Sequence, residues 1–593
     1  MPILRLAHLL PHKVIIKEGI NMLKSQEIRK IAPEMDPLRM GMGWKAEDLG
    51  KPQILIESTY GQSHPGSAHL LGLAQKAQAG ADSAGGKAAL YFATDICDGM
   101  AQGHDGINYS LPSRDIIADL VEIHANATTF DGGVFLASCD KSVPALLMAI
   151  GRINIPAVFV TGGVMEAGPD LLTLEQIGKY SAMFQRGEIT EEQFTYYKHN
   201  ACPSCGACSF MGTASTMQIM AESLGLMLPG SALMPATCAD LGDVAVEAGK
   251  AAVALAEKGI RASDIVTQKS FENAIMVHAA ISGSTNTLMH LPAIAHEFGI
   301  ELDADAFDRL HRGAHYLLNI RPAGEWPAQY FYYAGGVPRI MEEIRSMLHL
   351  DVLTVTGKTL GENLDALKAS GYYEKCDGYL RKTGLKRTDV IRSFDDPIGT
   401  NGAIAILRGN IAPDGAVVKH TAVPKEMHKA LLRARPFNSE EAAIDAILTH
   451  KIQPGDAVII RYEGPRGSGM PEMFYTTEAI SSDPALAASI ALLTDGRFSG
   501  ASRGPAIGHI SPEAAEGGPI ALVEEGDLIE IDIEKRVLRV CGIHGTPMDE
   551  SEIARVFAER RKTLPPFQSR YTRGVLKRFT QSAQSPMKGG YMD

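Results

Sequence analysis

The segment "GGVFLASCDKSVPALLMAIGRINIPAVFVTGG" (residues 132–163) decides the fold class of this chain. An apolar run ends in "SCD", a stretch with apolar residues at helical spacing follows, and a second apolar run ends in "TGG". Two buried strands joined by a helix in this way form a βαβ unit, whose strands are parallel. The apolar runs "GKPQILIES" and "AALYFATDI" and the helical stretch "SLPSRDIIADLVEIHANA" continue the pattern upstream. The sequence therefore predicts an α/β fold with a parallel sheet covered by helices.

The C-terminal third has a different pattern. Its apolar runs, such as "GAIAILRGNIAPDGAVVK", "GDAVIIRYEG" and "GDLIEIDIEKRVLRV", are short and are separated by Gly, Pro and Asp. This spacing is typical of strands joined by tight turns. We therefore predict an α/β domain over residues 1–388 and a strand-rich, β-barrel-like domain over residues 389–593. The polar tail "QSAQSPMKGGYMD" is expected to be loosely held.

Composition narrows the class of protein. A net charge of −12 with no long basic run argues against a nucleic-acid surface. No apolar run is long enough to span a bilayer, and the N-terminus lacks the features of a secretory signal. Eight cysteines in 593 residues are too few for a disulfide scaffold. We expect a cytoplasmic protein with reduced thiols and no nucleic-acid or membrane partner.

Three of the cysteines, Cys202, Cys205 and Cys208, lie within the stretch "HNACPSCGACSF" (residues 199–210). Such a run is a set of packed thiols, a redox pair, a structural zinc site or part of an iron–sulfur site. The context of a thioredoxin-like redox motif is absent, and no second pair of ligands completes a zinc tetrahedron. An iron–sulfur cluster takes thiolates from separate segments, so Cys97 or Cys139 could join this set.

Both of those cysteines are followed by an acid, as Cys97–Asp98 and Cys139–Asp140. Each pair ends a predicted strand, and ligands collect beyond the carboxyl ends of parallel strands. Carboxylate oxygens suit Mg²⁺, whereas thiolates suit iron. The alternative reading of each Asp is a cap on the helix that follows it. Two such pairs in one sheet favour a site that binds both kinds of metal.

The second predicted domain contributes two candidates in loops rich in Gly. Glu463 lies in "RYEGPRGSGMPEM", and Ser499 lies in "TDGRFSGASRG". Both loops could equally be tight surface turns. Because Ser499 lacks the surroundings of a nucleophile elbow, a reactive role would require a nearby metal to acidify its hydroxyl.

Seven stretches together resemble the dihydroxy-acid/6-phosphogluconate dehydratase family. They are "CDGMAQGHDGINYSLPSRD", "SCDKSVPALLMA", "CGACSFMGTASTM", "GSTNTLMHLPAIAH", "GNIAPDGAVVKHTA", "YEGPRGSGM" and "DGRFSGASRGPAIGHISPEA". The stretches follow the family's order, and the resemblance covers roughly residues 40–550. The resemblance implies a hydro-lyase with an iron–sulfur cluster and Mg²⁺, built from an α/β domain and a barrel-like domain.

For the cluster, the resemblance implies that Cys139 and Cys208 are thiolate ligands. Members with a 2Fe–2S cluster carry another cysteine near the N-terminus, where this chain has Gly66 in "SHPGSAH". Branches without that cysteine resemble oxygen-sensitive 4Fe–4S enzymes, which is the type we favour over 2Fe–2S. The third thiolate is then expected from Cys97 or Cys205, and Cys202 is expected to be structural.

For the magnesium, the resemblance implies that Asp98, Asp140 and Glu463 are ligands. Lys141 matches a lysine that is carbamylated in better-known members, which would make it an anionic ligand. Ser499 matches the proposed catalytic base. Ser499 and Lys141 are therefore the expected catalytic residues.

The implied reaction is loss of water from a 2,3-dihydroxy carboxylic acid to give a 2-oxo acid. "CDGMAQG", "VTGKTLGENL" and "SALMPA" are similar to the sugar-acid branch, in particular the xylonate dehydratases, so an aldonate such as xylonate or gluconate is the expected substrate. The alternative is 2,3-dihydroxyisovalerate of branched-chain amino-acid biosynthesis, and a phosphorylated sugar acid ranks third. The family implies a homodimer or homotetramer. An inactive iron–sulfur sensor and a zinc hydrolase that uses Ser499 are the alternatives from other classes.

Overall fold

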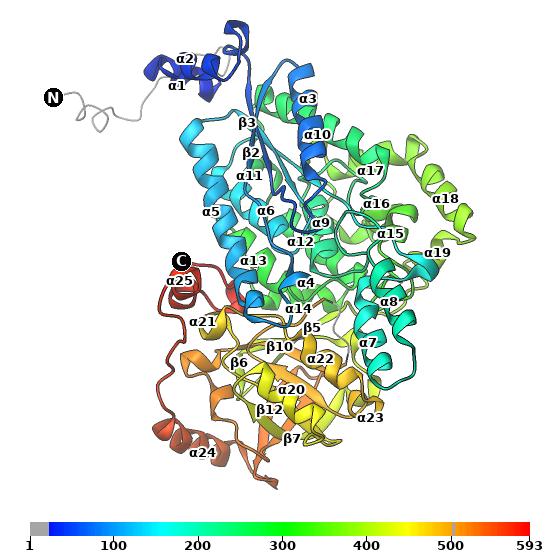
Figure 1. The fold of residues 1–593 in the computed structure, drawn as a ribbon, viewed down its shortest axis with the longest axis vertical. Helices are drawn as coiled ribbons and strands as arrows, with labels where there is room; N and C mark the ends of the chain where they lie inside the picture. The colour runs from blue at the N-terminus through cyan, green and yellow to red at the C-terminus, as the bar shows by residue number, and fades with distance from the viewer. Residues whose placement is uncertain (1–22, 501–503) are drawn as a thin grey trace, which may run out of the picture.

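The computed structural model describes residues 23–500 and 504–593, and its N-terminal part is built on a four-stranded parallel sheet (Figure 1). The strand order is β2-β1-β3-β4, and each neighbouring pair is parallel. The predicted α/β class is confirmed; three strands lie within the apolar runs that predicted them, and β2 begins one residue before its run. The strands are β1 (Gln53–Ser58), β2 (Lys87–Phe92), β3 (Gly132–Ala137) and β4 (Ala157–Thr161).

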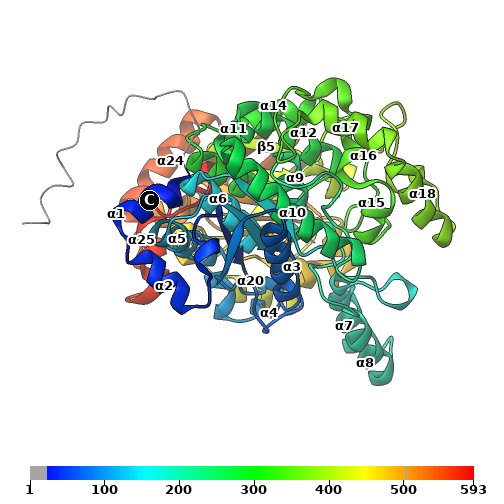
Figure 2. The same cartoon turned by 90° about the horizontal axis from the view of Figure 1, so that it is seen from above.

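Helices cover both faces of this sheet. Helices α5 (Ser110–Thr128) and α6 (Ser142–Ile153) lie on one side, and α3 (Leu70–Ser83) and α10 (Ala239–Lys258) lie on the other (Figures 1 and 2). A Cβ atom added at Gly249 of α10 would lie 2.1 Å from the carbonyl oxygen of Ala77 in α3. The close packing of α3 on α10 therefore requires glycine at this position.

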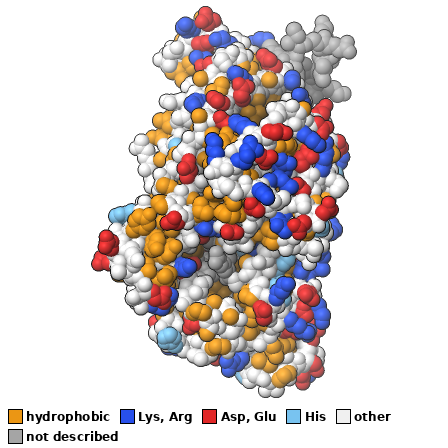
Figure 3. Space-filling view, turned by 90° about the vertical axis from the view of Figure 1, so that its right-hand side faces the viewer, with side chains coloured by type: hydrophobic (Ala, Val, Ile, Leu, Met, Phe, Trp, Pro, Cys, Tyr) orange, Lys and Arg blue, Asp and Glu red, His pale blue; other side chains and the backbone are white. Residues whose placement is uncertain are grey.

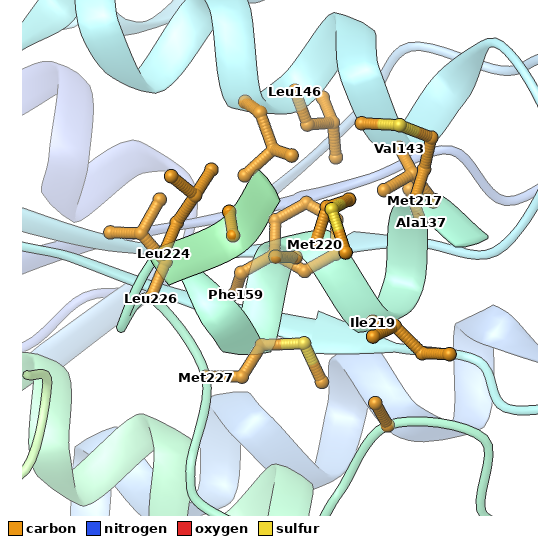
Figure 4. Packing of buried hydrophobic residues seen from close by; sticks show 14 of the residues in the cluster. Ala137, Val143, Leu146, Phe159, Met217, Ile219, Met220, Leu224, Leu226 and Met227 are labelled. Atoms are coloured by element: carbon orange, nitrogen blue, oxygen red, sulfur yellow. The ribbon is translucent and has the colours of Figure 1, made fainter. Parts of the chain in front are cut away.

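The strand order reverses between β1 and β3, whose carboxyl ends border the crevice where ligands bind in sheets of this kind. Side chains from β3, β4, α6 and α9 (Thr213–Ser223) pack tightly beneath that crevice (Figure 4). Phe159 of β4 and Met220 of α9 are each almost fully buried in this cluster. A close-packed base of this type holds the loops above it in fixed positions.

The remaining helices of the N-terminal part extend the α layer. Helices α7 and α8 form a hairpin that projects from the body of the molecule (Figure 2). The helices of eight or more residues not yet named, together with the seven-residue α2, are α1 (Lys24–Ile31), α2 (Met35–Gly41), α7 (Ile177–Gln185), α8 (Glu191–Asn200), α12 (Gln268–Ile281), α13 (Thr287–Glu297), α14 (Ala304–Arg312), α16 (Gly336–Glu343), α17 (Leu360–Ala369) and α18 (Tyr372–Thr383). Short helices are α4 (Asp98–Ala101), α11 (Ala262–Ile265), α15 (Gln329–Tyr333) and α19 (Arg387–Val390).

The C-terminal part is an eight-stranded mixed β-barrel, which confirms the barrel-like prediction. Its strands follow the order β11-β7-β8-β9-β10-β6-β5-β12, and pairing of β11 with β12 closes the ring, with β13 added at the edge of β12. Closure leaves the barrel without free strand edges apart from this short addition. The strands are β5 (Ile404–Gly409), β6 (Ala412–Lys419), β7 (Lys429–Phe437), β8 (Asp456–Ile460), β9 (Ala491–Thr494), β10 (Ala506–Ser511), β11 (Leu528–Asp532), β12 (Val537–Ile543) and β13 (Thr546–Pro547).

Strands β7 to β10 are parallel to one another, and helices connect them on the outside of the barrel. The connecting helices are α20 (Glu440–Leu448), α21 (Pro465–Ser468), α22 (Phe474–Ser481) and α23 (Pro484–Ala487). Helices α24 (Glu550–Thr563) and α25 (Gly574–Ser582) follow the barrel. The predicted domain boundary after residue 388 stays a prediction.

The prediction for the C-terminal tail is wrong. Met587 and Tyr591 are buried, and the fully buried Arg114 of α5 donates hydrogen bonds to the carbonyl oxygens of Gly589 and Gly590 at 3.0 and 3.1 Å. The tail is polar in composition, but its backbone carbonyl groups accept hydrogen bonds from a buried guanidinium. This contact holds the tail in place.

The distribution of charged side chains on the surface agrees with the absence of a long basic run in the sequence. Basic and acidic side chains are interspersed over the face shown in Figure 3. Within the described part of the chain, no helix combines the length and apolar character needed to cross a membrane.

Candidate active site

The loops that follow β2 and β3 of the parallel sheet meet at one cavity. The cavity has a volume of about 460 Å³ and is lined by residues of both parts of the molecule. The loop after β2 contributes Cys97 and Asp98, and the loop after β3 contributes Cys139 and Asp140. Their convergence follows from the parallel sheet, in which all strands end at the same edge. Ser499, from the loop after β9, lies in the same lining.

One group of donor atoms in the cavity is made of thiols. The donor atoms of Cys97, Cys139 and His64 lie within 4.8 Å of one another. Cys208 lines the same cavity, whereas Cys205 is not among its lining residues in the described part of the chain. Cys97, Cys139 and Cys208 thus line one cavity, whereas Cys205 does not.

The charge state of these thiols depends on their contacts. A hydrogen bond from the Cys139 thiol lowers the pKa of Cys97 to about 6. Burial raises the pKa of Cys208 well above its usual value. Metals bind the thiolate form, so binding of a cluster would displace the proton that Cys208 otherwise holds.

A second group of donors is made of carboxylates. Oxygens of Asp98, Asp140 and Glu472 lie within 4.8 Å of one another. Burial, together with the negative charges of Asp98 and Glu472, raises the pKa of Asp140 to about 7 against the opposing effect of Lys141. Burial also raises the pKa of Glu472. Carboxylates that repel one another in a buried site are stabilised by a cation between them.

Two buried basic residues hold this acidic group. Lys141 donates a hydrogen bond to Asp98 Oδ2 at 2.6 Å, and Arg497 pairs with Glu472 and lies 3.6 Å from Asp98 Oδ2. Burial opposes ionisation of Asp98, but these two positive charges outweigh it and lower its pKa. When all three carboxyls are ionised, the two basic side chains do not neutralise them, and a metal ion would balance the remaining charge.

Glu463 lies apart from the group formed by Asp98, Asp140 and Glu472. Its carboxylate accepts a hydrogen bond from Ser468 and faces a second cavity of about 490 Å³, which it shares with Arg570. Burial raises its pKa to about 8. The structure instead brings Glu472 of the same loop to Asp98 and Asp140. The two glutamates are separated by the short helix α21 and the following turn, so proximity in the sequence did not distinguish them.

The loop that carries Ser499 is pressed against the start of helix α9. A Cβ atom added at Gly500 would lie 2.7 Å from Gly212 Cα, so a larger residue could not approach this closely. The backbone N–H of Ala214 in α9 donates to Asp140 Oδ1 at 3.0 Å. Ser499 and the acidic group are therefore positioned by the same helix terminus.

Asn286 connects three parts of the site and lies in the "GSTNTLMHLPAIAH" stretch of the resemblance. Its amide nitrogen lies 2.8 Å from Thr213 Oγ1, 3.1 Å from Glu472 Oε1 and 3.3 Å from the carbonyl oxygen of Phe498. Asn286 is fully buried. The "GSTN" turn quoted from the sequence therefore acts between the acidic group and the loop that carries Ser499.

The outer wall of the cavity is mostly apolar. It is formed by helices α7 and α22, which face each other across the opening, and a Cβ atom at Gly178 of α7 would lie 1.9 Å from Glu478 Oε2 of α22. The apolar residues of the wall are Leu174, Ile177, Ala182, Phe194, Phe210, Ile444, Leu448, Phe474 and Ala479.

The fold and the donors define the class of protein: an α/β domain and a β-barrel that share a cavity with soft thiol donors and hard carboxylate donors. The family models of the dihydroxy-acid/6-phosphogluconate dehydratase N-terminal and C-terminal domains match residues 51–363 and 389–590. The chain belongs to this family and is a hydro-lyase.

Several relatives match over nearly the whole chain. A dihydroxy-acid dehydratase of Oleidesulfovibrio alaskensis is 43% identical over 562 residues, which cover 93% of this chain and 96% of that protein. Dihydroxy-acid dehydratase 1 of Methanosarcina acetivorans is 42% identical over 589 residues, with 98% and 99% covered. A dihydroxy-acid dehydratase of Acetivibrio thermocellus is 44% identical over 564 residues, with 93% and 96% covered. These names favour the alternative substrate, 2,3-dihydroxyisovalerate, over the sugar acids that three short stretches of the sequence had suggested.

Proposed function

We propose that this chain dehydrates a branched-chain 2,3-dihydroxy acid, with 2,3-dihydroxyisovalerate giving 2-oxoisovalerate as the model reaction. The observation that carries the proposal is the cavity in which the thiols, the carboxylates and Ser499 meet beneath an apolar wall. The names of the relatives support it. A short aliphatic tail suits that wall, whereas each hydroxyl of a sugar acid would need a polar partner there.

The donors fit both cofactors of the proposal. Asp98 Oδ1 is buried without a hydrogen-bond partner among the described residues, as expected of an oxygen reserved for a cation. Asp98, Asp140 and Glu472 would hold Mg²⁺. Cys97, Cys139 and Cys208 would hold an iron–sulfur cluster, for which 4Fe–4S remains the favoured type. When bound, Mg²⁺ and the cluster iron supply Lewis acidity toward the substrate carboxylate with its C2 hydroxyl and toward the C3 hydroxyl.

The chain's own residues then account for the proton transfers. Ser499, at the cavity lining, takes the proton from C2. The C2–H bond and the C3–O bond break, and the proton taken from C2 passes from Ser499 to the C3 hydroxyl, which leaves as water. The resulting enol loses its hydroxyl proton and gains a proton at C3 as it becomes the 2-oxo acid. No electrons are exchanged with an external donor. The apolar wall of α7 and α22 keeps bulk water from the reacting carbons.

Lys141 has two roles in the proposal. As an ammonium group it neutralises Asp98, with which it forms the 2.6 Å hydrogen bond. Carbamylation, which the resemblance implies, would convert it into an additional anionic oxygen ligand. The mass of the intact protein under CO₂, compared with that of Lys141→Met, tests this: an added mass of one CO₂ only in the wild type supports the modification.

We further propose a homodimer or homotetramer that works in the cytoplasm, where reducing conditions keep thiols free to bind metal. Light scattering on the purified holoenzyme measures the assembly. A monomer at micromolar concentration would contradict this part of the proposal.

The central test is a substrate panel. The enzyme is purified without oxygen, supplied with Mg²⁺, and assayed for 2-oxo acids formed from 2,3-dihydroxyisovalerate, xylonate and gluconate. We expect kcat/KM for the branched-chain substrate to exceed that for either sugar acid by at least about 100-fold, since mispaired polar groups cost 1–3 kcal/mol each. A preference for xylonate or gluconate would overturn the substrate assignment. Stoichiometric zinc without iron would overturn the dehydratase mechanism itself.

A further inference from the structure

His64 lies beside the thiol group but has no role in the reaction described above. It sits in the loop that follows β1, next to the crevice where the strand order reverses. The residue is 4% exposed, and its ring atom Nδ1 is buried without a hydrogen-bond partner among the described residues. A buried imidazole nitrogen of this kind requires an explanation, because burial without a partner costs free energy.

The other ring nitrogen is fully engaged. His64 Nε2 lies 2.8 Å from Asp95 Oδ1 and 3.0 Å from Ser67 Oγ. Ser67 Oγ donates its own proton to the carbonyl oxygen of Gly61 at 3.1 Å, so toward His64 it can only accept. Both neighbours therefore accept a hydrogen bond, and Nε2 carries the proton. In the neutral imidazole, Nδ1 is then a free lone pair.

The imidazole of His64 is close to the thiols. The donor atoms of His64, Cys97 and Cys139 lie within 4.8 Å of one another. A Cβ atom built on Gly66 would lie 3.1 Å from His64 Nδ1 and 3.4 Å from Cys139 Sγ. The position at which the sequence lacks a cysteine is thus bordered by an imidazole nitrogen and a thiol.

The hydrogen bonds around His64 are those of a metal-binding histidine. Such histidines commonly donate their second ring N–H to a carboxylate, which fixes the tautomer and the orientation of the ring. Here the carboxylate of Asp95 is itself held by Ser142, whose hydroxyl donates to Asp95 Oδ2 at 2.5 Å. Ser142 Oγ also accepts from the backbone N–H of Cys139 at 3.2 Å, so one chain of hydrogen bonds connects the imidazole with a thiol residue.

We propose that His64 is a nitrogen ligand of the iron–sulfur cluster in the substrate-free enzyme, through Nδ1. The proposal rests on the proposed cluster with Cys97, Cys139 and Cys208 as thiolate ligands. Imidazole ligation of iron–sulfur centres is chemically established and raises their reduction potential relative to all-thiolate ligation. His64 would occupy the iron position that no thiolate takes and would protect the cluster from loss of iron until substrate arrives.

The test uses the anaerobically prepared holoenzyme, reduced with dithionite and examined by pulsed electron paramagnetic resonance. Wild type grown with ¹⁵N-histidine is compared with unlabelled wild type. We expect a strong ¹⁴N coupling from a directly bound nitrogen, replaced by ¹⁵N in the labelled protein and absent from His64→Gln. His69→Gln is the matched control, because His69 lies in the same loop and its Nε2 is hydrogen-bonded to the Gly162 carbonyl oxygen; it should retain the coupling. A nitrogen coupling as weak as that of a nitrogen that is only hydrogen-bonded to the cluster overturns the proposal. The absence of any nitrogen coupling overturns it as well.

Two further measurements cover a variant that folds poorly or a cluster that gives no resonance signal. ⁵⁷Fe Mössbauer spectra of the unreduced wild type should contain one iron site with a nitrogen ligand, and His64→Cys should convert it to a thiolate-bound site. Exposure to air should bleach the His64→Gln cluster faster than wild type by at least about tenfold. Four equivalent sulfur-ligated irons in wild type, or equal bleaching rates, would contradict the assignment. If wild type binds no iron and sulfide at all, the proposed function fails; if it binds a cluster and turns over without nitrogen ligation, only the role of His64 fails.

Discussion

The thiol group and the acidic group occupy the same cavity but are built in different ways. Cys97, Cys139 and Cys208 all come from the N-terminal part, from loops above the parallel sheet and before α9. The acidic group combines Asp98 and Asp140 of that part with Glu472 of the C-terminal part. The soft donors therefore depend on the fold of one sheet, whereas the hard donors form only when the barrel docks against it.

The contacts at this junction explain how the second group is maintained. The guanidinium of Arg497, from the barrel, is fully buried, pairs with Glu472 and donates to Ser110 Oγ of the N-terminal part at 2.9 Å. Removal of one partner from a buried ion pair typically costs about 3–5 kcal/mol. The comparison teaches that the thiol group is complete within the N-terminal part, while the acidic group needs residues of both parts.

The largest expected effect comes from breaking the thiol group. Cys139→Ser should abolish both the brown colour and turnover, because a hydroxyl does not replace a thiolate ligand of iron. Iron and sulfide analysis of the anaerobic protein, together with the 2-oxo-acid assay, measures the loss. Cys541→Ser in strand β12 is the control and should keep both properties. Unchanged turnover in Cys139→Ser would show that the cluster role assigned to Cys139 is wrong.

The next effect separates the two glutamates of the C-terminal part. Glu472→Gln should weaken Mg²⁺ binding by more than about 100-fold, since partners outside the ligand shell already contribute about 10–100-fold. Its iron content should stay normal, because the thiols lie on the other side of the cavity. Mg²⁺ titration of activity and calorimetry measure the change, with Glu463→Gln as the matched variant. A larger loss of Mg²⁺ affinity in Glu463→Gln would restore the ligand that the resemblance implied.

A smaller effect is expected at the connection between the acidic group and the loop of Ser499. Asn286→Ala removes hydrogen bonds to Glu472 and Phe498, which should lower kcat and Mg²⁺ affinity by about 10–100-fold while the iron content stays constant. Asn286→Asp keeps the shape of the side chain but places a second negative charge beside the Glu472 carboxylate. This variant should therefore also bind Mg²⁺ less tightly than wild type. A loss of iron in Asn286→Ala would mean that the two groups are not separable.

The smallest effect concerns the sheet that carries the thiol loops. Burial raises the pKa of Glu57, in β1, to about 8, so its carboxyl is protonated in the folded protein at neutral pH. The unfolded chain releases this proton near the ordinary value of 4.5, and the folded state therefore binds more protons between about pH 4.5 and 8. Stability should fall as pH rises through this window, by up to about 1.4 kcal/mol per pH unit.

Glu57→Gln removes this titration, so the midpoint of thermal unfolding should depend less on pH between 5 and 8 than in wild type. Calorimetry across this range measures the difference. Glu257→Gln, at an exposed position of α10, is the control and should follow wild type. A pH profile of Glu57→Gln that also matches wild type would show that Glu57 is already ionised in the folded protein.

The sequence predicted the features that repeat along the chain. Runs such as "GGVFLASCD" and "IPAVFVTGG" predicted the parallel strands. The shorter apolar runs after about residue 390, separated by Gly, Pro and Asp, predicted the barrel. Local order also placed Cys97, Asp98, Cys139 and Asp140 at strand ends, where the structure has them. Alternation and strand length follow from local backbone geometry and from the burial of the sheet, so they can be read without tertiary information.

The sequence by itself therefore determined the fold class, the family resemblance and the loops that line the site. Only the tertiary structure distinguished Glu472 from Glu463, brought Cys97 and not Cys205 to the cavity, and positioned Asn286 and His64 against the donors. The physical reason is that these choices depend on how two separately built parts pack across tens to hundreds of residues. The conformation of a helical turn or a loop decides which carboxylate or imidazole faces the cavity. That conformation leaves the pattern of apolar residues unchanged, so the pattern does not reveal it.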